Sequence, residues 1–139
     1  MLGLLLVERI EATKAYTNYP GYDLIAFNAA ENISCRIQVK SRWATDYDRS
    51  FPLKSFDAEV VAHVALNRGY RGYRKQPTLD DDGRRAPQVY VLPMDVARSV
   101  LRDSGKWGSK VYLREIPDVD EYVDNWGQVR RHAAPGPRP

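Results

Sequence analysis

Asp23, Gln38 and Lys40 are residue types that, if brought together, suit metal-assisted hydrolysis of a phosphodiester bond. Gln38 and Lys40 are two positions apart in a segment that alternates apolar and polar residues, so they share one face of a predicted strand. Asp23 is at the beginning of the preceding apolar segment. In an antiparallel hairpin the start of the first strand lies opposite the end of the second. We therefore expect the carboxylate, the amide and the ammonium group to lie together.

These groups suit a site for Mg²⁺, with Mn²⁺ as a substitute, because hard cations take oxygen ligands. We expect Asp23 to supply the charged ligand, Gln38 its side-chain carbonyl and Val39 its main-chain carbonyl. The metal would lower the pKa of a bound water. Lys40 would orient or deprotonate that water and stabilise the transition state. The alternative for the same residues is a surface aspartate in an ordinary ion pair with Lys40.

The elements that must position these residues are a hairpin and the strands beside it. Residues 33–40 alternate in polarity over eight positions, which predicts a strand, and residues 22–27 predict the strand before it. Residues 58–66 are nearly all apolar and predict a central strand that is buried on both faces. His63 lies in this segment, where we interpret it as a buried histidine with satisfied hydrogen bonds rather than a general base. Residues 88–92 predict a further strand.

The rest of the chain adds flanking elements. The predicted set is a helix over 1–9, an edge strand over 11–17, a helix from Pro93 to Gly105, a strand over 110–114, and a helix that begins at a capping box at Asp118 and buries Trp126. The fold class is therefore α/β, with a mixed β-sheet flanked by helices. We expect a single domain over residues 1–132 and a disordered tail over 133–139, because the tail has no apolar face to bury.

Two stretches resemble the PD-(D/E)XK nuclease superfamily: Gly21-Tyr22-Asp23-Leu24, and Arg-Ile-Gln-Val-Lys-Ser at 36–41. They are most similar to small bacterial relatives of group I intron homing endonucleases and to Mrr-type restriction endonucleases, where the second acidic position is often glutamine, as at Gln38. The likeness continues through residues 58–66, 89–93 and 106–108. It implies a restriction-endonuclease-like fold and Mg²⁺-dependent cleavage of DNA, which makes DNA the expected partner.

The sequence departs from the family pattern in two places. Pro20 precedes Asp23 by three residues rather than one, and Glu8 is the only candidate for the glutamate that the family places on its first helix. Without that acid, Asp23 alone brings formal charge to the metal site. A non-catalytic DNA-binding or interaction module that keeps the nuclease fold is therefore the alternative. A protein-interaction domain unrelated to nucleic acid is the third hypothesis.

Basic residues beyond the proposed site are candidates for DNA contacts, since lysine and arginine neutralise backbone phosphates. The candidates are Arg42, Arg68, Arg71, Arg74 and Lys75. The last four belong to one polar loop that also holds two tyrosines, and a solvated loop is the equal alternative for it. Cutting both strands of a duplex would require two active sites, which a homodimer would provide.

Composition bounds these hypotheses without deciding among them. The net charge of +3 is only mildly basic. Cys35 is the only cysteine, so no internal disulfide can form, and we interpret it as a packing residue in a cytoplasmic protein. The apolar run Leu4–Val7 is too short to span a membrane.

Overall fold

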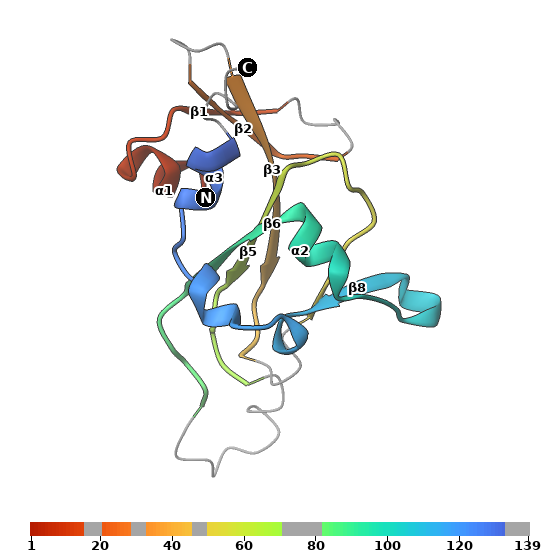
Figure 1. Cartoon of the computed structure of the whole chain (residues 1–139). Coiled ribbons are helices and arrows are strands. Elements are labelled where there is room, and N and C mark those ends of the chain that lie inside the picture. The colour runs from red at the N-terminus through yellow and green to blue at the C-terminus, as the bar shows by residue number, and fades with distance from the viewer. Residues whose placement is uncertain (16–20, 29–32, 46–49, 71–81, 133–139) are drawn as a thin grey trace.

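In the described part of the chain, a five-stranded mixed sheet forms the centre of the computed structural model (Figure 1). The structure describes residues 1–15, 21–28, 33–45, 50–70 and 82–132. In spatial order the strands are β1 (Ala12–Lys14), β2 (Leu24–Asn28), β3 (Ile33–Arg42), β5 (Val60–Ala65) and β6 (Gln88–Pro93). β3 pairs antiparallel with β2 and parallel with β5, and the other neighbours are antiparallel. The mixed sheet, its hairpin and its buried strand β5 confirm the predictions.

The central sheet has an apolar core on each face, and the apolar residues of β3 belong to the first of them. On the first face Cys35 and Ile37 are fully buried, and α1 (Leu2–Val7) and α3 (Gly127–His132) cover them. Burial raises the pKa of the Cys35 thiol to about 12, so this cysteine serves as an apolar packing residue. None of the helices in the described residues is long and apolar enough to cross a membrane.

The second face of the central sheet packs against α2 (Met94–Ser99) and a smaller sheet. The smaller sheet has the order β4 (Ser50–Pro52), β8 (Ser109–Tyr112), β7 (Leu101–Asp103). Three 3₁₀ helices, η2 (Gly105–Trp107), η3 (Leu113–Glu115) and η4 (Val119–Tyr122), complete the described elements. The buried side chains between the two sheets include Phe51, Val61, Tyr90, Leu92 and Val111. This is the face that carries Gln38 and Lys40.

The predicted helix from Pro93 to Gly105 is wrong in its second half. α2 ends at Ser99, and the next residues form β7, where Leu101 pairs with Val111. Val96 and Val100 are spaced as a helix requires, but pairing with β8 gives the backbone of residues 101–103 hydrogen-bond partners in a second sheet. Tertiary pairing has overridden the local pattern here.

The predicted capping box at Asp118 is also wrong. Asp118 has a left-handed backbone (φ +52) and makes no side-chain cap hydrogen bond, and only the short η4 follows it. The α-helix of this region, α3, begins at Gly127. Trp126 is buried, as the sequence predicts, although it precedes the helix rather than lying within it.

Candidate active site

Asp23 lies just before β2 and forms two hydrogen bonds with β3, one through its main chain and one through its side chain. Its main-chain amide donates to the Ile37 carbonyl at 2.8 Å, as in a strand. Its carboxylate Oδ2 then accepts the amide of Val39 at 2.7 Å, two residues further along β3. A carboxylate that accepts a backbone N–H is held by a charge-assisted hydrogen bond. Asp23 is thus fixed at the middle of β3, although the residue is exposed.

Gln38 and Lys40 lie on one face of β3, as the alternation predicts. Leu24 pairs with Ile37 at the end of the β2–β3 ladder, and Asp23 and Gln38 are the next residues along the two chains. Gln38 is 8% exposed, and its Oε1 has no hydrogen-bond partner among the described residues. Lys40 is half-buried and level with His63 of β5. The structure therefore brings the three predicted residues to one part of the sheet.

The alternative of an ordinary ion pair finds no support in this geometry. Within the described residues, no ion pair joins the Asp23 carboxylate to the Lys40 ammonium group. The carboxylate is held by the Val39 amide instead. The amide and carbonyl of one strand residue point to the same side of the strand. The Val39 carbonyl is therefore expected on the edge of β3 that faces Asp23.

Any metal site here would have few charged ligands. The described residues contain no group of three or more His, Cys, Asp or Glu side chains that could hold a metal ion. Glu8, the candidate for the missing acid, accepts from Arg130 of α3 at its main-chain oxygen (2.9 Å) and its carboxylate (3.4 Å). α1 and α3 cover the face of the sheet opposite to Gln38. Asp23 is therefore the one carboxylate of the predicted set on the Gln38 face.

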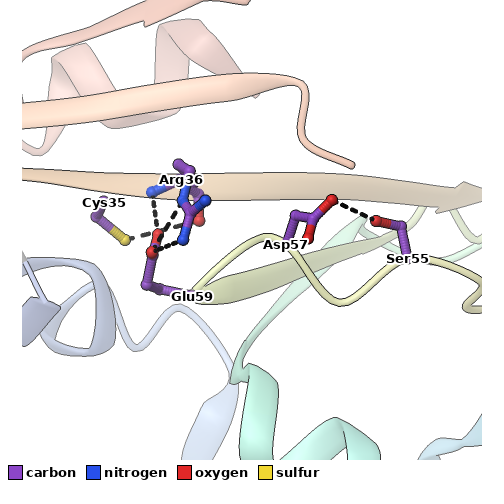
Figure 2. A network of polar contacts seen from close by, with 5 residues as sticks. All are labelled: Cys35, Arg36, Ser55, Asp57 and Glu59. Atoms are coloured by element: carbon purple, nitrogen blue, oxygen red, sulfur yellow. Dashed lines mark hydrogen bonds and ion pairs between the residues drawn. The ribbon is translucent and has the colours of Figure 1, made fainter. Parts of the chain in front are cut away.

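Two acids that the sequence analysis did not single out lie near the start of β5. Glu59 accepts from Arg36 at its carboxylate, with 2.6 Å from the main-chain amide and 2.9 Å from Nε, and Asp57 accepts from Ser55 (Figure 2). Burial works to raise the pKa of Glu59, but the hydrogen bonds and charge of Arg36 outweigh it and hold the pKa below its ordinary value. The hydrogen bond to Glu59 in turn raises the pKa of Arg36. This pair fastens β3 to β5, so Glu59 has a structural role.

Asp57 lies beside the turn that leads to Asp23. Gly21 has φ +107, and a Cβ built there would be 2.8 Å from Asp57 Oδ2 and 3.0 Å from Ser55 Oγ. Glycine is needed at this position both for its backbone conformation and for this close approach. The only sequence signal for Asp57 and Glu59 is that each just precedes the apolar strand β5.

Gly21→Ala is expected to lower the free energy of unfolding by about 1–3 kcal/mol, because it combines an unfavourable φ with a close contact to Asp57. Urea denaturation of the two proteins measures the difference. Gly105→Ala is the matched control, since Gly105 also has a positive φ (+65) but a methyl group added there would meet nothing within 4 Å. If both variants lose the same free energy of unfolding, the close contact with Asp57 makes no contribution to the effect at Gly21.

The predicted DNA contacts are only partly covered by the structure. Arg42 Nη1 donates to the main-chain oxygen of Ser50 at 2.6 Å and to its hydroxyl at 3.1 Å. Arg68 is exposed and forms an isolated β-bridge with Arg84. Arg71, Arg74 and Lys75 lie outside the described residues.

Comparison with known proteins supports the fold. No protein-family model matches the chain. The chain is 23% identical over 107 residues to probable phosphoketolase 1 of Rhizobium meliloti (strain 1021); the match covers 75% of this chain but only 13% of that protein, so the chain spans about an eighth of its length. A solved structure of a bacterial homing endonuclease, I-Ssp6803I, superposes with a TM-score of 0.56 at 17% identity, covering 95% of this chain and 85% of that one. The protein therefore has an endonuclease-like α/β fold.

Proposed function

We propose that this protein is a metal-dependent endonuclease that hydrolyses DNA phosphodiester bonds at a site formed by Asp23, Gln38 and Lys40. The observation that carries the proposal is the buried Gln38 Oε1, which lacks a hydrogen-bond partner among the described residues, while the amide of the next residue, Val39, holds the Asp23 carboxylate. A buried carbonyl oxygen without a donor is unfavourable by about 1–3 kcal/mol. A hard cation would satisfy it, and oxygen is the ligand that such a cation prefers.

Each residue of the proposed site has a separate role in this reaction. Asp23 would supply the charged ligand to a metal ion, and the Gln38 side chain and the Val39 carbonyl would supply neutral oxygens. Mg²⁺, or Mn²⁺ in its place, would supply Lewis acidity and would lower the pKa of a water. The Lys40 ammonium group orients that water and offsets the negative charge that develops on the phosphate. The half-buried position of Lys40 strengthens this interaction, because fewer solvent dipoles screen the charge.

Other basic residues of the chain would extend the contact with DNA. We assign phosphate contacts to Arg42, Arg68, Arg71, Arg74 and Lys75. Endonuclease activity on both strands of a duplex would require two such sites, which a symmetric homodimer provides. The likeness to a homing endonuclease supports DNA as the substrate class.

Asp23→Asn tests the metal site directly. Asparagine keeps an oxygen for the Val39 amide but removes the charge, so we expect a folded protein whose Mn²⁺ affinity falls about tenfold or more, because ligand charge sets the affinity for hard cations. Isothermal titration calorimetry measures the affinity. Asp95→Asn is the control, since exposed Asp95 likewise accepts a main-chain amide, from Val96 at 2.9 Å. Equal Mn²⁺ affinity in both variants and the parent protein would contradict the proposed ligand.

A non-catalytic DNA-binding module is the second candidate, and the contact between Glu8 and Arg130 favours it, because this contact holds the candidate helix acid on the opposite face of the sheet. Supercoiled plasmid distinguishes the two functions. Nicking that requires Mg²⁺ or Mn²⁺ and stops with a chelator supports the endonuclease. Salt-dependent DNA binding by a folded protein that never nicks the plasmid supports the binding module.

A further inference from the structure

A second polar site lies further along the face that carries Lys40. It is a cavity of about 70 Å³ near the carboxyl ends of β3 and β5, and its walls include Arg42, His63, Asn67, Arg85 and Tyr90. This volume is several times the roughly 10–15 Å³ in which one water fits. Neither Gln38 nor Asp23 borders it, so it is separate from the proposed metal site.

His63 is a lining residue of this cavity with an unsatisfied hydrogen-bonding atom. It is 1% exposed and stacks on Phe51, with ring centroids 4.7 Å apart. Its Nδ1 has no hydrogen-bond partner among the described residues. The prediction of a buried histidine is therefore confirmed, but the prediction that its hydrogen bonds are satisfied is wrong. An unsatisfied ring nitrogen on a residue that lines a polar cavity favours a polar ligand there.

The charges around His63 select the kind of ligand. Two arginines line the cavity, and the guanidinium group of each is held in place: Arg42 donates to Ser50, and Arg85 Nη2 donates to the Tyr70 hydroxyl at 2.9 Å. Burial, and then the positive charge of Arg42, lower the pKa of His63 to about 4, while a hydrogen bond to the main chain of Lys40 works in the opposite direction. The positive field of Arg42 thus reaches the ring. A cation would be repelled there, whereas an oxyanion would be attracted.

We propose that the Arg42–His63–Arg85 cavity binds one phosphate-type oxyanion. Inorganic phosphate and a backbone phosphate of nucleic acid share this chemistry. The second source fits the position of the cavity, since Arg42 follows Lys40 by two residues on the same face, about 6.6 Å along the strand. A strand of DNA held at Lys40 could then place a neighbouring phosphate in the cavity. Binding of inorganic phosphate, by contrast, does not depend on the proposed endonuclease activity.

Nuclear magnetic resonance of the histidine side chains tests the proposal on the full chain. His63 and His132 are the only histidines, so their ring signals can be assigned with one variant. Added inorganic phosphate is expected to shift the His63 signals saturably and to raise the pKa of His63, because a nearby anion favours the imidazolium form. His132, whose Nδ1 contacts the Gln128 carbonyl at 2.8 Å, is the internal control. Chloride at matched ionic strength should change neither ring. A His63 ring that does not respond to saturating phosphate overturns the site.

Two neighbouring arginines provide a matched pair of variants. Arg85 borders the cavity, whereas Arg84 does not and is paired with Asp82 at 3.4 Å. Both are exposed, so neither substitution should unfold the protein. Arg85→Gln is expected to weaken phosphate binding about tenfold, the effect of losing one charge-assisted contact, and Arg84→Gln to leave it nearly unchanged. Equal effects in the two variants overturn the assignment of the cavity.

A short DNA single strand without terminal phosphates separates the two sources. If it shifts the His63 signals and competes with inorganic phosphate, the cavity takes a backbone phosphate. If inorganic phosphate alone shifts them, the cavity takes a free phosphate or a terminal phosphate group. Both outcomes support the oxyanion site, and either can be obtained with a protein that never cuts DNA. Failure of the proposed endonuclease activity is therefore distinguishable from failure of this site.

Discussion

Lys40→Ala is expected to reduce metal-dependent nicking of supercoiled plasmid by about 10²–10⁴-fold, the range for loss of a group that assists proton transfer or stabilises the transition state. The variant should fold, because the Lys40 ammonium group makes no ion pair with a described residue and its removal leaves no buried partner unsatisfied. Binding of DNA should fall much less than cleavage. Nicking rates and DNA affinity, measured on the same preparation, separate the two effects.

Lys14→Ala is the matched control for this experiment. Lys14 is an exposed lysine on β1, the edge strand, so the substitution removes the same charge without touching β3. We expect Lys14→Ala to nick plasmid at nearly the parent rate. Any small difference in rate should disappear at high salt, because salt screens the contribution of an exposed charge. Metal-dependent nicking that survives in Lys40→Ala would mean that the active site lies elsewhere in the chain.

Acidification is expected to destabilise the protein by about 3 kcal/mol through His63 alone. Burial and the charge of Arg42 lower the pKa of His63 from 6.5 to about 4 in the folded state. Between these two values the unfolded chain binds a proton that the folded chain does not, so stability is fully present above pH 6.5 and is lost as the pH falls towards 4. A difference of 2.5 pKa units corresponds to roughly 3 kcal/mol.

Urea denaturation across this pH range, in a buffer without phosphate, measures the loss. His63→Gln removes the titrating group, so the extra loss of the parent protein relative to this variant isolates His63 from the carboxylates. His132→Gln is the control and should behave like the parent protein. If His63→Gln does not fold, a direct titration of the His63 ring signal in the parent protein gives its pKa. A value near 6.5 would contradict the prediction.

The sequence predicts the parts of this fold in which local pattern and tertiary structure agree. Residues 33–40 alternate because β3 adds apolar side chains to the core on one face of the sheet only, and residues 60–65 are nearly all apolar because β5 is paired on both sides and covered on both faces. The shared face of Gln38 and Lys40 follows from the same period of two. For these reasons the arrangement of the candidate site could be predicted from the sequence, whereas some of the elements that surround it could not.

The remaining features depend on contacts between distant segments. Leu101 becomes a strand residue because it pairs with Val111 of β8. The local sequence of residues 96–101 gives no indication of this partner. The carboxylate of Asp57 approaches Gly21 across a separation of 36 positions, which no local pattern encodes. The cavity beside His63 likewise needs β3, β5 and residue 85 together. Such features become visible only when the chain is folded.

The hydrogen bond from the Val39 amide to Asp23 also has a consequence for the order of folding. It closes a hairpin between residues 16 positions apart, whereas the Arg36–Glu59 pair that fastens the parallel strand spans 23 positions. Loop closure is entropically cheaper over the shorter span, so the hairpin should form first and the parallel pairing later. Residues 23 and 38–40 would then already be aligned in the transition state for folding. We expect a conservative substitution within this hairpin to slow refolding, and one in β4 or β8 to accelerate unfolding instead.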